Sequence, residues 1–261
     1  MTDHETLHVT LQDGVMKIIL DRPKANAFNQ TMVDELMAVL KSADRDRAVR
    51  CLLLTGAGRI FSAGQDLDAL GQVDGEVSFR AHLQKTYNPI ILRMRSLEKP
   101  ILGAINGPAA GAGLGIALAT DIRLASDQAR FVFGFSGIGL TSDSGTSISL
   151  PRLIGLARAS HMAFTNEPVT AQDALAWGMV NRVVPSDDLM DEAEALASSL
   201  AEGPTRSIGL TKRAFNRAVF PDLAEALDYE AHLQEIAGRT EDHAEGVAAF
   251  KEKRPPDFSG S

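Results

Sequence analysis

The sequence has little cysteine, few aromatic residues and no excess of positive charge. Only one of its 261 residues is a cysteine, and 5% are aromatic. One thiol excludes a disulfide framework and a cysteine-based metal site, and the position of Cys51 in an apolar run predicts a buried structural thiol. The net charge of -8 argues against sequence-independent binding to nucleic acid, which requires clustered lysine and arginine.

Two further absences concern membranes and export. No segment has the roughly 20 nearly uninterrupted apolar residues that a membrane span requires. The first six residues are polar and acidic, without the basic and apolar regions of a signal peptide. We therefore expect a cytoplasmic protein without a membrane partner. With 44% apolar and 23% charged residues, the composition is typical of a globular chain with a large core.

The order of local patterns predicts an α/β fold. Two alternating segments flank Asp13-Gly14, which indicates a hairpin. Helical and strand patterns then alternate along the chain. The expected helices are 29–43, 77–97 and 113–119, and the expected strands are 7–11, 15–20, 51–55, 100–105 and 122–125. After Pro151 strand signals nearly vanish, and helices are expected at 157–164, 171–177, 186–201, 205–219, 222–236 and 241–251.

Two strand-to-helix junctions are rich in small residues. The first, 61–67, follows a buried strand and could expose backbone N–H groups to a ligand; a simple loop into a helix is the alternative. The second, 105–115, ends where a helix begins, so free N–H groups and the positive end of the helix dipole could stabilise an enolate oxygen. Close helix packing is compatible with that role. The second junction lacks the phosphate-loop ending and the downstream acid of a dinucleotide-binding unit.

With these two junctions, the chain resembles the crotonase superfamily over nearly its whole length. The resemblance implies a spiral of ββα units over residues 1–199 and a helical region over 200–261 that builds trimers or dimers of trimers. It also implies an acyl-CoA thioester substrate, with CoA as part of the substrate, no separate cofactor and no metal. The N–H groups of Gln65 and Ala112 would hold the thioester oxygen.

The chain departs from typical hydratases of this superfamily at two positions. Their two catalytic glutamates correspond to Gly115 and Phe135 here. Water addition needs one group to activate water and one to protonate carbon. The chain therefore lacks both groups that hydratases use for this reaction.

One carboxylate remains nearby, in the polar turn 139–146. Asp143 is similar in placement to the catalytic aspartate of dienoyl-CoA isomerases and of the phenylacetate-pathway isomerases that convert ring-epoxidised phenylacetyl-CoA to an oxepin. The alternative is a helix N-cap, since aspartate followed by Ser144-Gly145-Thr146 is good capping chemistry.

Within the superfamily, the chain most resembles those phenylacetate-pathway isomerases. It departs from their frequent Pro-Asp-x-Gly-Gly motif, having Ser142-Asp143-Ser144-Gly145-Thr146 instead. The matching segments are 50–59, 63–67, 87–89, the turn around Asp143, 237–239 and 245–250.

The resemblance also implies where CoA binds. Lys24 and Arg59 are candidates for its phosphates by sign and position only, and the helical tail is expected to reach the CoA of a neighbouring subunit. The residues expected to contact CoA are Lys24, Ala25, Ala63, Gln65, Asp66, Leu67, Gly111, Ala112, Phe250 and Lys253.

Other candidate sites have weaker support. His82, His161 and His232 form no metal-binding pair on one helix and are expected at the surface or in packing contacts. Ser142 and Ser144 lack the elbow of a serine hydrolase. Two rival functions stay open: hydration or thioester hydrolysis with Asp143 alone, and acyl-CoA binding without catalysis. The location of Asp143, in a cavity beside the two N–H donors or outside it, discriminates between an enzyme and a binding protein.

Overall fold

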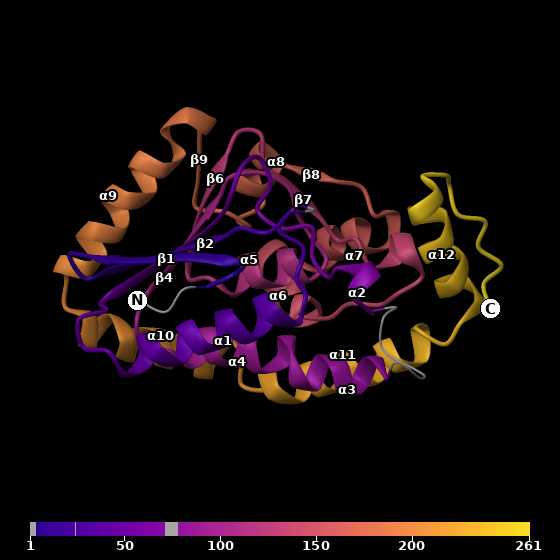
Figure 1. Cartoon of the computed structure of the whole chain (residues 1–261), viewed down its shortest axis with the longest axis horizontal. Coiled ribbons are helices and arrows are strands. Elements are labelled where there is room, and N and C mark those ends of the chain that lie inside the picture. The colour runs from indigo at the N-terminus through magenta and orange to yellow at the C-terminus, as the bar shows by residue number, and fades with distance from the viewer. Residues whose placement is uncertain (1–3, 24, 71–77) are drawn as a thin grey trace.

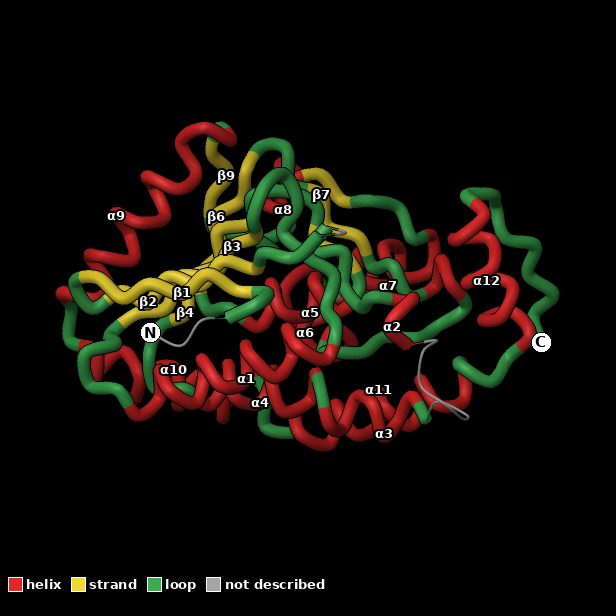
Figure 2. Tube along the Cα trace, viewed as in Figure 1, coloured by secondary structure: helices red, strands yellow, loops and turns green. Residues whose placement is uncertain are grey.

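A computed structural model of the chain describes residues 4–23, 25–70 and 78–261. In this part of the chain, a six-stranded sheet and a three-stranded sheet are surrounded by helices (Figures 1 and 2). The α/β class predicted from the sequence is confirmed.

The larger sheet begins with the predicted hairpin. Strands β1 (Leu7–Gln12) and β2 (Val15–Leu20) are antiparallel. Asp13 and Gly14 between them both have positive φ, as a two-residue hairpin turn of type I′ requires. The remaining strands are parallel to β2 and give the order β1-β2-β3-β4-β6-β9: β3 (Cys51–Gly56), β4 (Ile101–Ile105), β6 (Ile122–Ser126) and β9 (Arg182–Val184).

The parallel order brings the two glycine-rich junctions together. Strands β3 and β4 are neighbours, so the segments that follow them leave the same edge of the sheet. The smaller sheet lies beyond this edge and consists of β5 (Ala109–Ala110), β7 (Arg130–Val132) and β8 (Val169–Thr170) in the order β5-β7-β8.

The remaining regular elements of the described chain are helices. They are α1 (Gln30–Arg45), α2 (Leu67–Leu70), α3 (Phe79–Lys85), α4 (Tyr87–Ser96), α5 (Ala112–Ala119), α6 (Thr146–Ile154), α7 (Leu156–Thr165), α8 (Ala171–Ala176), α9 (Leu189–Glu202), α10 (Thr205–Val219), α11 (Leu223–Ala237) and α12 (Glu241–Glu252), with short 3₁₀ turns η1 (Ser136–Ile138) and η2 (Ser186–Asp188).

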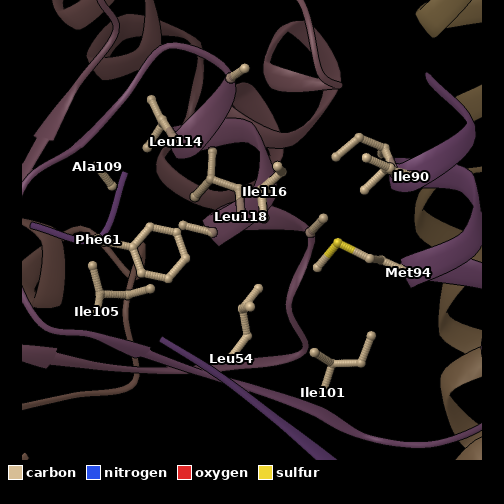
Figure 3. Close-up of a cluster of buried hydrophobic side chains, with 14 of the residues drawn as sticks. Leu54, Phe61, Ile90, Met94, Ile101, Ile105, Ala109, Leu114, Ile116 and Leu118 are labelled. Carbon is tan, nitrogen blue, oxygen red and sulfur yellow. The ribbon is translucent and has the colours of Figure 1, made fainter. Parts of the chain in front are cut away.

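Both faces of the larger sheet are buried, which explains its nearly continuous apolar strands. Successive side chains of a strand point to opposite faces. Leu53 of β3 packs with the alanine-rich face of α9, whereas Leu54 belongs to the main core on the other face. Figure 3 shows part of this main core, in which Leu54 and Phe61 lie among side chains of α4 and α5.

Several local predictions differ from the structure. The stretch 77–97 forms two helices that are separated at Thr86, and Val77 lies outside the described residues. Helix α6 was not expected, because Pro151 lies inside it. Strands β8 and β9 were also not expected, since each has only two or three residues. The proposed division at residue 199 falls within α9 and stays a prediction.

The C-terminal helices contact the rest of the chain. Helix α11 packs against α3, α4 and α6, and α12 packs against η1. None of the helices in the described ranges has the length and apolarity needed to cross a membrane. Those ranges also contain no group of three or more His, Cys, Asp or Glu side chains arranged to hold a metal ion.

A buried arginine fixes the carboxyl end of α5. Arg123 of β6 donates hydrogen bonds to the carbonyl oxygens of Thr120 and Leu118, at 2.5 and 3.3 Å, and to that of Met179 at 2.7 Å. Burial lowers the pKa of Arg123 to about 10, so the side chain stays charged at neutral pH. A positive charge at this end of α5 also interacts favourably with the helix dipole.

Replacing Arg123 with methionine should destabilise the fold by about 3 kcal/mol, because buried carbonyl oxygens lose their donors. The free energy of unfolding can be measured by urea denaturation. The matched control is Arg182→Met, which removes an exposed ion pair with Glu192 and should cost no more than about 1 kcal/mol. Equal losses in the two variants would contradict a structural role for Arg123.

Candidate active site

The two glycine-rich junctions are in direct contact. Ser62 and Ala109 form a parallel bridge, and the Ala110 N–H donates to the Ser62 carbonyl at 3.0 Å. Gly64 has a φ of 87°, and a Cβ at this position would lie 2.7 Å from the Ala110 carbonyl oxygen and 3.2 Å from the Ala112 nitrogen. A side chain at residue 64 would therefore force the junctions apart.

Two backbone N–H groups beside this contact are unsatisfied. The N–H groups of Gln65 and Ala112 donate to no acceptor among the described residues. Ala112 is the first residue of α5, where N–H groups have no intrahelical partner and the helix dipole is positive. Both residues line a cavity of about 1320 Å³. Two such donors, fixed before substrate binds, suit the stabilisation of a developing oxyanion.

Asp143 lines the same cavity and is only 7% exposed. Its Oδ1 accepts a hydrogen bond from the Ser144 hydroxyl at 2.7 Å, and its Oδ2 accepts one from Gln234 Nε2 at 3.0 Å. The carboxylate is thus held in place by one neighbour in sequence and by one residue of α11. This location is the one expected for an enzyme.

The carboxylate of Asp143 does not cap a helix. Helix α6 begins at Thr146, whose N–H donates to the backbone carbonyl of Asp143 at 3.0 Å, and the N–H groups on either side, those of Gly145 and Ser147, donate to the carboxylate of Glu230 at 2.8 Å each. Glu230 belongs to α11 and caps α6 from outside. The capping interpretation of Asp143 is therefore wrong, because a distant carboxylate occupies that position.

The environment of Asp143 favours its neutral form. Burial and the nearby charge of Glu230 raise its pKa to about 7, although the hydrogen bonds from Ser144 and Gln234 oppose the shift. A carboxylate with a pKa close to the working pH can both accept and return a proton. Burial also raises the pKa of Glu230.

The structure gives a steric reason for the missing glutamate at position 115 and shows an apolar side chain at position 135. A Cβ at Gly115 would lie 2.4 Å from the Ser144 Cβ and 2.7 Å from the Ser144 carbonyl oxygen, so the turn after Asp143 occupies that space. Phe135 lines the cavity and packs edge to face on Phe133, with ring centroids 5.0 Å apart. An apolar ring therefore stands where hydratases are expected to carry a carboxylate.

The cavity brings together the other residues predicted to bind CoA, except Lys24, which lies outside the described residues. Arg59 does not line it. The side chain of Asp66 is already engaged, because its carboxylate accepts from Arg22 Nη2 at 2.7 Å and from the N–H of Asp68 at 3.0 Å. The remaining predicted residues that line the cavity are Ala25, Ala63, Leu67, Gly111, Phe250 and Lys253.

Helix α12 contributes to the cavity of its own chain. Phe250 and Lys253 line the same cavity as Asp143, and the expected contact of this helical tail with the CoA of a neighbouring subunit stays a prediction. Glycine contacts dock α12 on η1: a Cβ at Gly246 would lie 2.6 Å from the carbonyl carbon of Ile138. His243 Nδ1 also lies 2.8 Å from the carbonyl oxygen of Ile138.

Sequence reasoning missed four polar residues of this region. His82 was expected at the surface or in packing; it lines the cavity, and its Nε2 lies 3.0 Å from Gln65 Oε1. Tyr87, Glu230 and Gln234 are buried. The spacing of Glu230 and Gln234, one turn apart on an otherwise buried helix face, was a signal that could have revealed them. His161 and His232 are exposed, as predicted.

The raised pKa of Asp143 predicts a pH-dependent stability difference. In the unfolded chain its pKa is near 3.8, so between that pH and about 7 only the folded state holds the proton, and stability falls as pH rises. Asparagine carries no such proton. The stability of Asp143→Asn relative to the native protein should therefore increase between pH 4 and pH 7 and be constant above.

Melting temperatures of both proteins at pH 4, 5.5, 7 and 8.5 provide the measurement. Asp127→Asn is the control: hydrogen bonds from Ser186 lower the pKa of Asp127, so both its folded and unfolded states are ionised above about pH 5, and its stability difference should stay constant from pH 5.5 to 8.5. A stability difference for Asp143→Asn that is the same at every pH would show that Asp143 titrates normally.

Comparisons with known proteins agree with this geometry. The Enoyl-CoA hydratase/isomerase family model matches residues 10–261. A 1,2-epoxyphenylacetyl-CoA isomerase of Escherichia coli (strain K12) is 43% identical over 253 residues, which cover 96% of this chain and 97% of the relative.

Solved structures show the same fold. An enoyl-CoA hydratase from Mycobacterium avium subsp. paratuberculosis K-10 superposes with a TM-score of 0.90 at 33% identity, over 98% of this chain and 100% of that one. An enoyl-CoA hydratase/isomerase from Pseudoalteromonas atlantica T6c gives 0.88 at 30% identity, with coverage of 98% and 100%. The chain therefore has the crotonase fold and belongs to the enoyl-CoA hydratase/isomerase family of enzymes.

Proposed function

We propose that the protein isomerises acyl-CoA thioesters by moving a proton through Asp143. The observation that carries this proposal is that the Asp143 carboxylate lines the same cavity as the unsatisfied N–H groups of Gln65 and Ala112. CoA enters as part of the substrate, and the reaction requires no separate cofactor.

The two N–H groups act on the thioester carbonyl. Removal of a proton from the adjacent carbon places negative charge on the carbonyl oxygen, and donors fixed around that oxygen stabilise the enolate more than the neutral thioester. Asp143 takes the proton and returns it to another carbon. The double bond shifts, and no atom is gained or lost overall.

We propose a ring-epoxidised phenylacetyl group as the preferred acyl group. The cavity wall is largely apolar and carries aromatic rings, with Phe79, Leu83, Phe135, Ile138 and Leu140 among its lining residues. The relative at 43% identity is named for this substrate. With an epoxide, Asp143 assists ring expansion to the oxepin, and with a 3-enoyl chain the same groups shift the double bond to the 2-position.

Hydration is the less favoured reaction of the family for this chain. Water addition needs two groups, one to activate water and one to protonate carbon. The positions that supply them in hydratases are Gly115, which the Ser144 turn fills, and Phe135, whose ring is apolar.

Asparagine at position 143 should abolish isomerisation without loss of substrate binding, because an amide cannot accept and return the proton. Turnover should fall by about 10²–10⁴-fold, with acyl-CoA affinity nearly unchanged. The assay incubates native and Asp143→Asn protein with ring-epoxidised phenylacetyl-CoA, 3-enoyl-CoA and 2-enoyl-CoA and identifies the products by mass spectrometry and chromatography.

The products separate the candidate functions. Oxepin or 2-enoyl products from the native protein support an isomerase, whereas a 3-hydroxyacyl product from 2-enoyl-CoA supports a hydratase. Near-normal turnover by Asp143→Asn would mean that another group moves the proton. Asp173→Asn, an exposed carboxylate at the start of α8, is the matched control and should keep normal turnover.

We also propose that the protein assembles as a trimer or a dimer of trimers. Large apolar side chains are exposed on helices of the C-terminal half, including Phe164 of α7, Phe215 of α10 and Tyr229 of α11, which are 61–83% exposed in the single chain. Burying them against other subunits would be favourable. Sedimentation at micromolar concentration should show a trimer or hexamer, and a fully active monomer would contradict this assembly.

A further inference from the structure

We propose that the side chain of Gln65 is a positioning group for the oxyanion donor on its own backbone, with Tyr87 and His82 as its partners. The inference rests on the proposed function, in which the Gln65 N–H holds the thioester oxygen. The family resemblance implies a role for the backbone N–H of Gln65 but none for its side chain.

Every hydrogen-bonding position of this carboxamide is used. Nε2 donates to the carbonyl oxygens of Phe28 and Asp66, at 3.1 Å each. Oε1 accepts from the Tyr87 hydroxyl at 2.7 Å and from His82 Nε2 at 3.0 Å. A primary amide has two N–H donors and two acceptor lone pairs, so the group is fully satisfied. Its orientation is thereby fixed from four directions.

The partners connect the residue to three separate parts of the fold. Phe28 directly precedes the N-cap of α1, His82 belongs to α3, and Tyr87 begins α4. Tyr87 is buried and packs edge to face on Phe28, with ring centroids 5.9 Å apart. The loop that carries the donor is therefore held by hydrogen bonds to residues at the start of α1, in α3 and at the start of α4.

The backbone around Gln65 directs its N–H away from these anchors. Phe28 N–H donates to the Gly64 carbonyl at 2.7 Å, and Asp66 N–H donates to the Phe28 carbonyl at 2.9 Å, which makes Phe28 and Gln65 a parallel bridge. In such a bridge the N–H of the central residue points to the opposite side. That side is where Gly64 contacts the second junction. The carboxamide of Gln65 therefore bonds on the Phe28 side of residues 64–66, while the backbone N–H of Gln65 points to the opposite side.

The contacts also fix the state of His82. Oε1 of Gln65 can only accept, so His82 must present Nε2–H to it, and a neutral ring then has no proton on Nδ1. Burial lowers the pKa of His82, which favours this neutral ring. The hydrogen bonds of the Gln65 carboxamide therefore hold the donor loop without placing a positive charge beside it.

The experiment replaces Gln65 with methionine, which has a similar length but no hydrogen-bonding groups. Because small misplacements of a catalytic donor cost large factors in rate, kcat for isomerisation should fall by about 10–100-fold, with KM changed by no more than about threefold. Gln84→Met is the matched control: Gln84 is exposed on the same helix as His82 and donates to the Asp228 carboxylate, so its loss should leave kcat unchanged.

A spectroscopic measurement tests positioning directly. Phenylacetyl-CoA labelled with ¹³C at the thioester carbonyl cannot isomerise, and its infrared carbonyl stretch should move to lower wavenumber on binding to the native protein. Gln65→Met should bind the probe but lose most of this shift. A native-sized shift and normal kcat in a folded Gln65→Met protein would overturn the inference. If even the native protein gives no shift, the oxyanion hole itself, and with it the proposed function, is wrong.

Single-contact variants keep the test decisive if Gln65→Met does not fold. Tyr87→Phe and His82→Phe each remove one donor to Oε1 and should each lower kcat and the carbonyl shift by part of the full effect. A native kcat and a native carbonyl shift in both single variants would overturn the inference. Where Gln65→Met folds, adding either change to it should have little further effect, because the contact is already absent. Full, additive losses in the double variants would show that Tyr87 and His82 act on the substrate themselves and would overturn their role as partners of Gln65.

Discussion

The contact between Gly64 and the backbone of Ala110 and Ala112 is the constraint on which the site depends. It fixes how far apart two N–H groups from different parts of the chain can lie. The parallel order of β3 and β4 makes the contact possible, because it releases both junctions at one edge of the sheet. The absence of a Cβ at residue 64 permits it, and the start of α5 at Ala112 supplies an N–H that no helix bond consumes.

The sequence pattern predicted the parts of this arrangement that are local. Apolar runs revealed β3 and β4, and runs of small residues revealed the junctions after them. That Gln65 and Ala112 share a cavity with Asp143 was expected from family resemblance. The structure agrees, although the roles of these residues stay predictions. Local signals failed for α6, where Pro151 suggests a break, and for β9, whose three residues join the sheet only through tertiary pairing.

The polar support of the site could not be predicted in the same way, because it comes from residues distant in sequence. Glu230 and Gln234 lie one turn apart on α11 and face the turn that contains Asp143. Glu230 satisfies N–H groups at the start of α6, while Gln234 binds the Asp143 carboxylate. One helix thus holds both the backbone and the side chain of this turn. Ser144 adopts a φ of 55° there, a conformation that a non-glycine residue keeps only when its surroundings enforce it.

The same turn links the position of Asp143 to the absence of a glutamate at residue 115. Ser144 lies so close to Gly115 that any side chain there would collide with its Cβ and carbonyl oxygen. A glutamate at position 115 and the present turn therefore exclude each other sterically. Restoring a hydratase carboxylate by Gly115→Glu alone would displace Ser144, and with it the carboxylate that Ser144 and Gln234 hold. In this structure the turn that holds Asp143 and a glutamate at position 115 would occupy the same space, so introducing that glutamate requires both segments to change together.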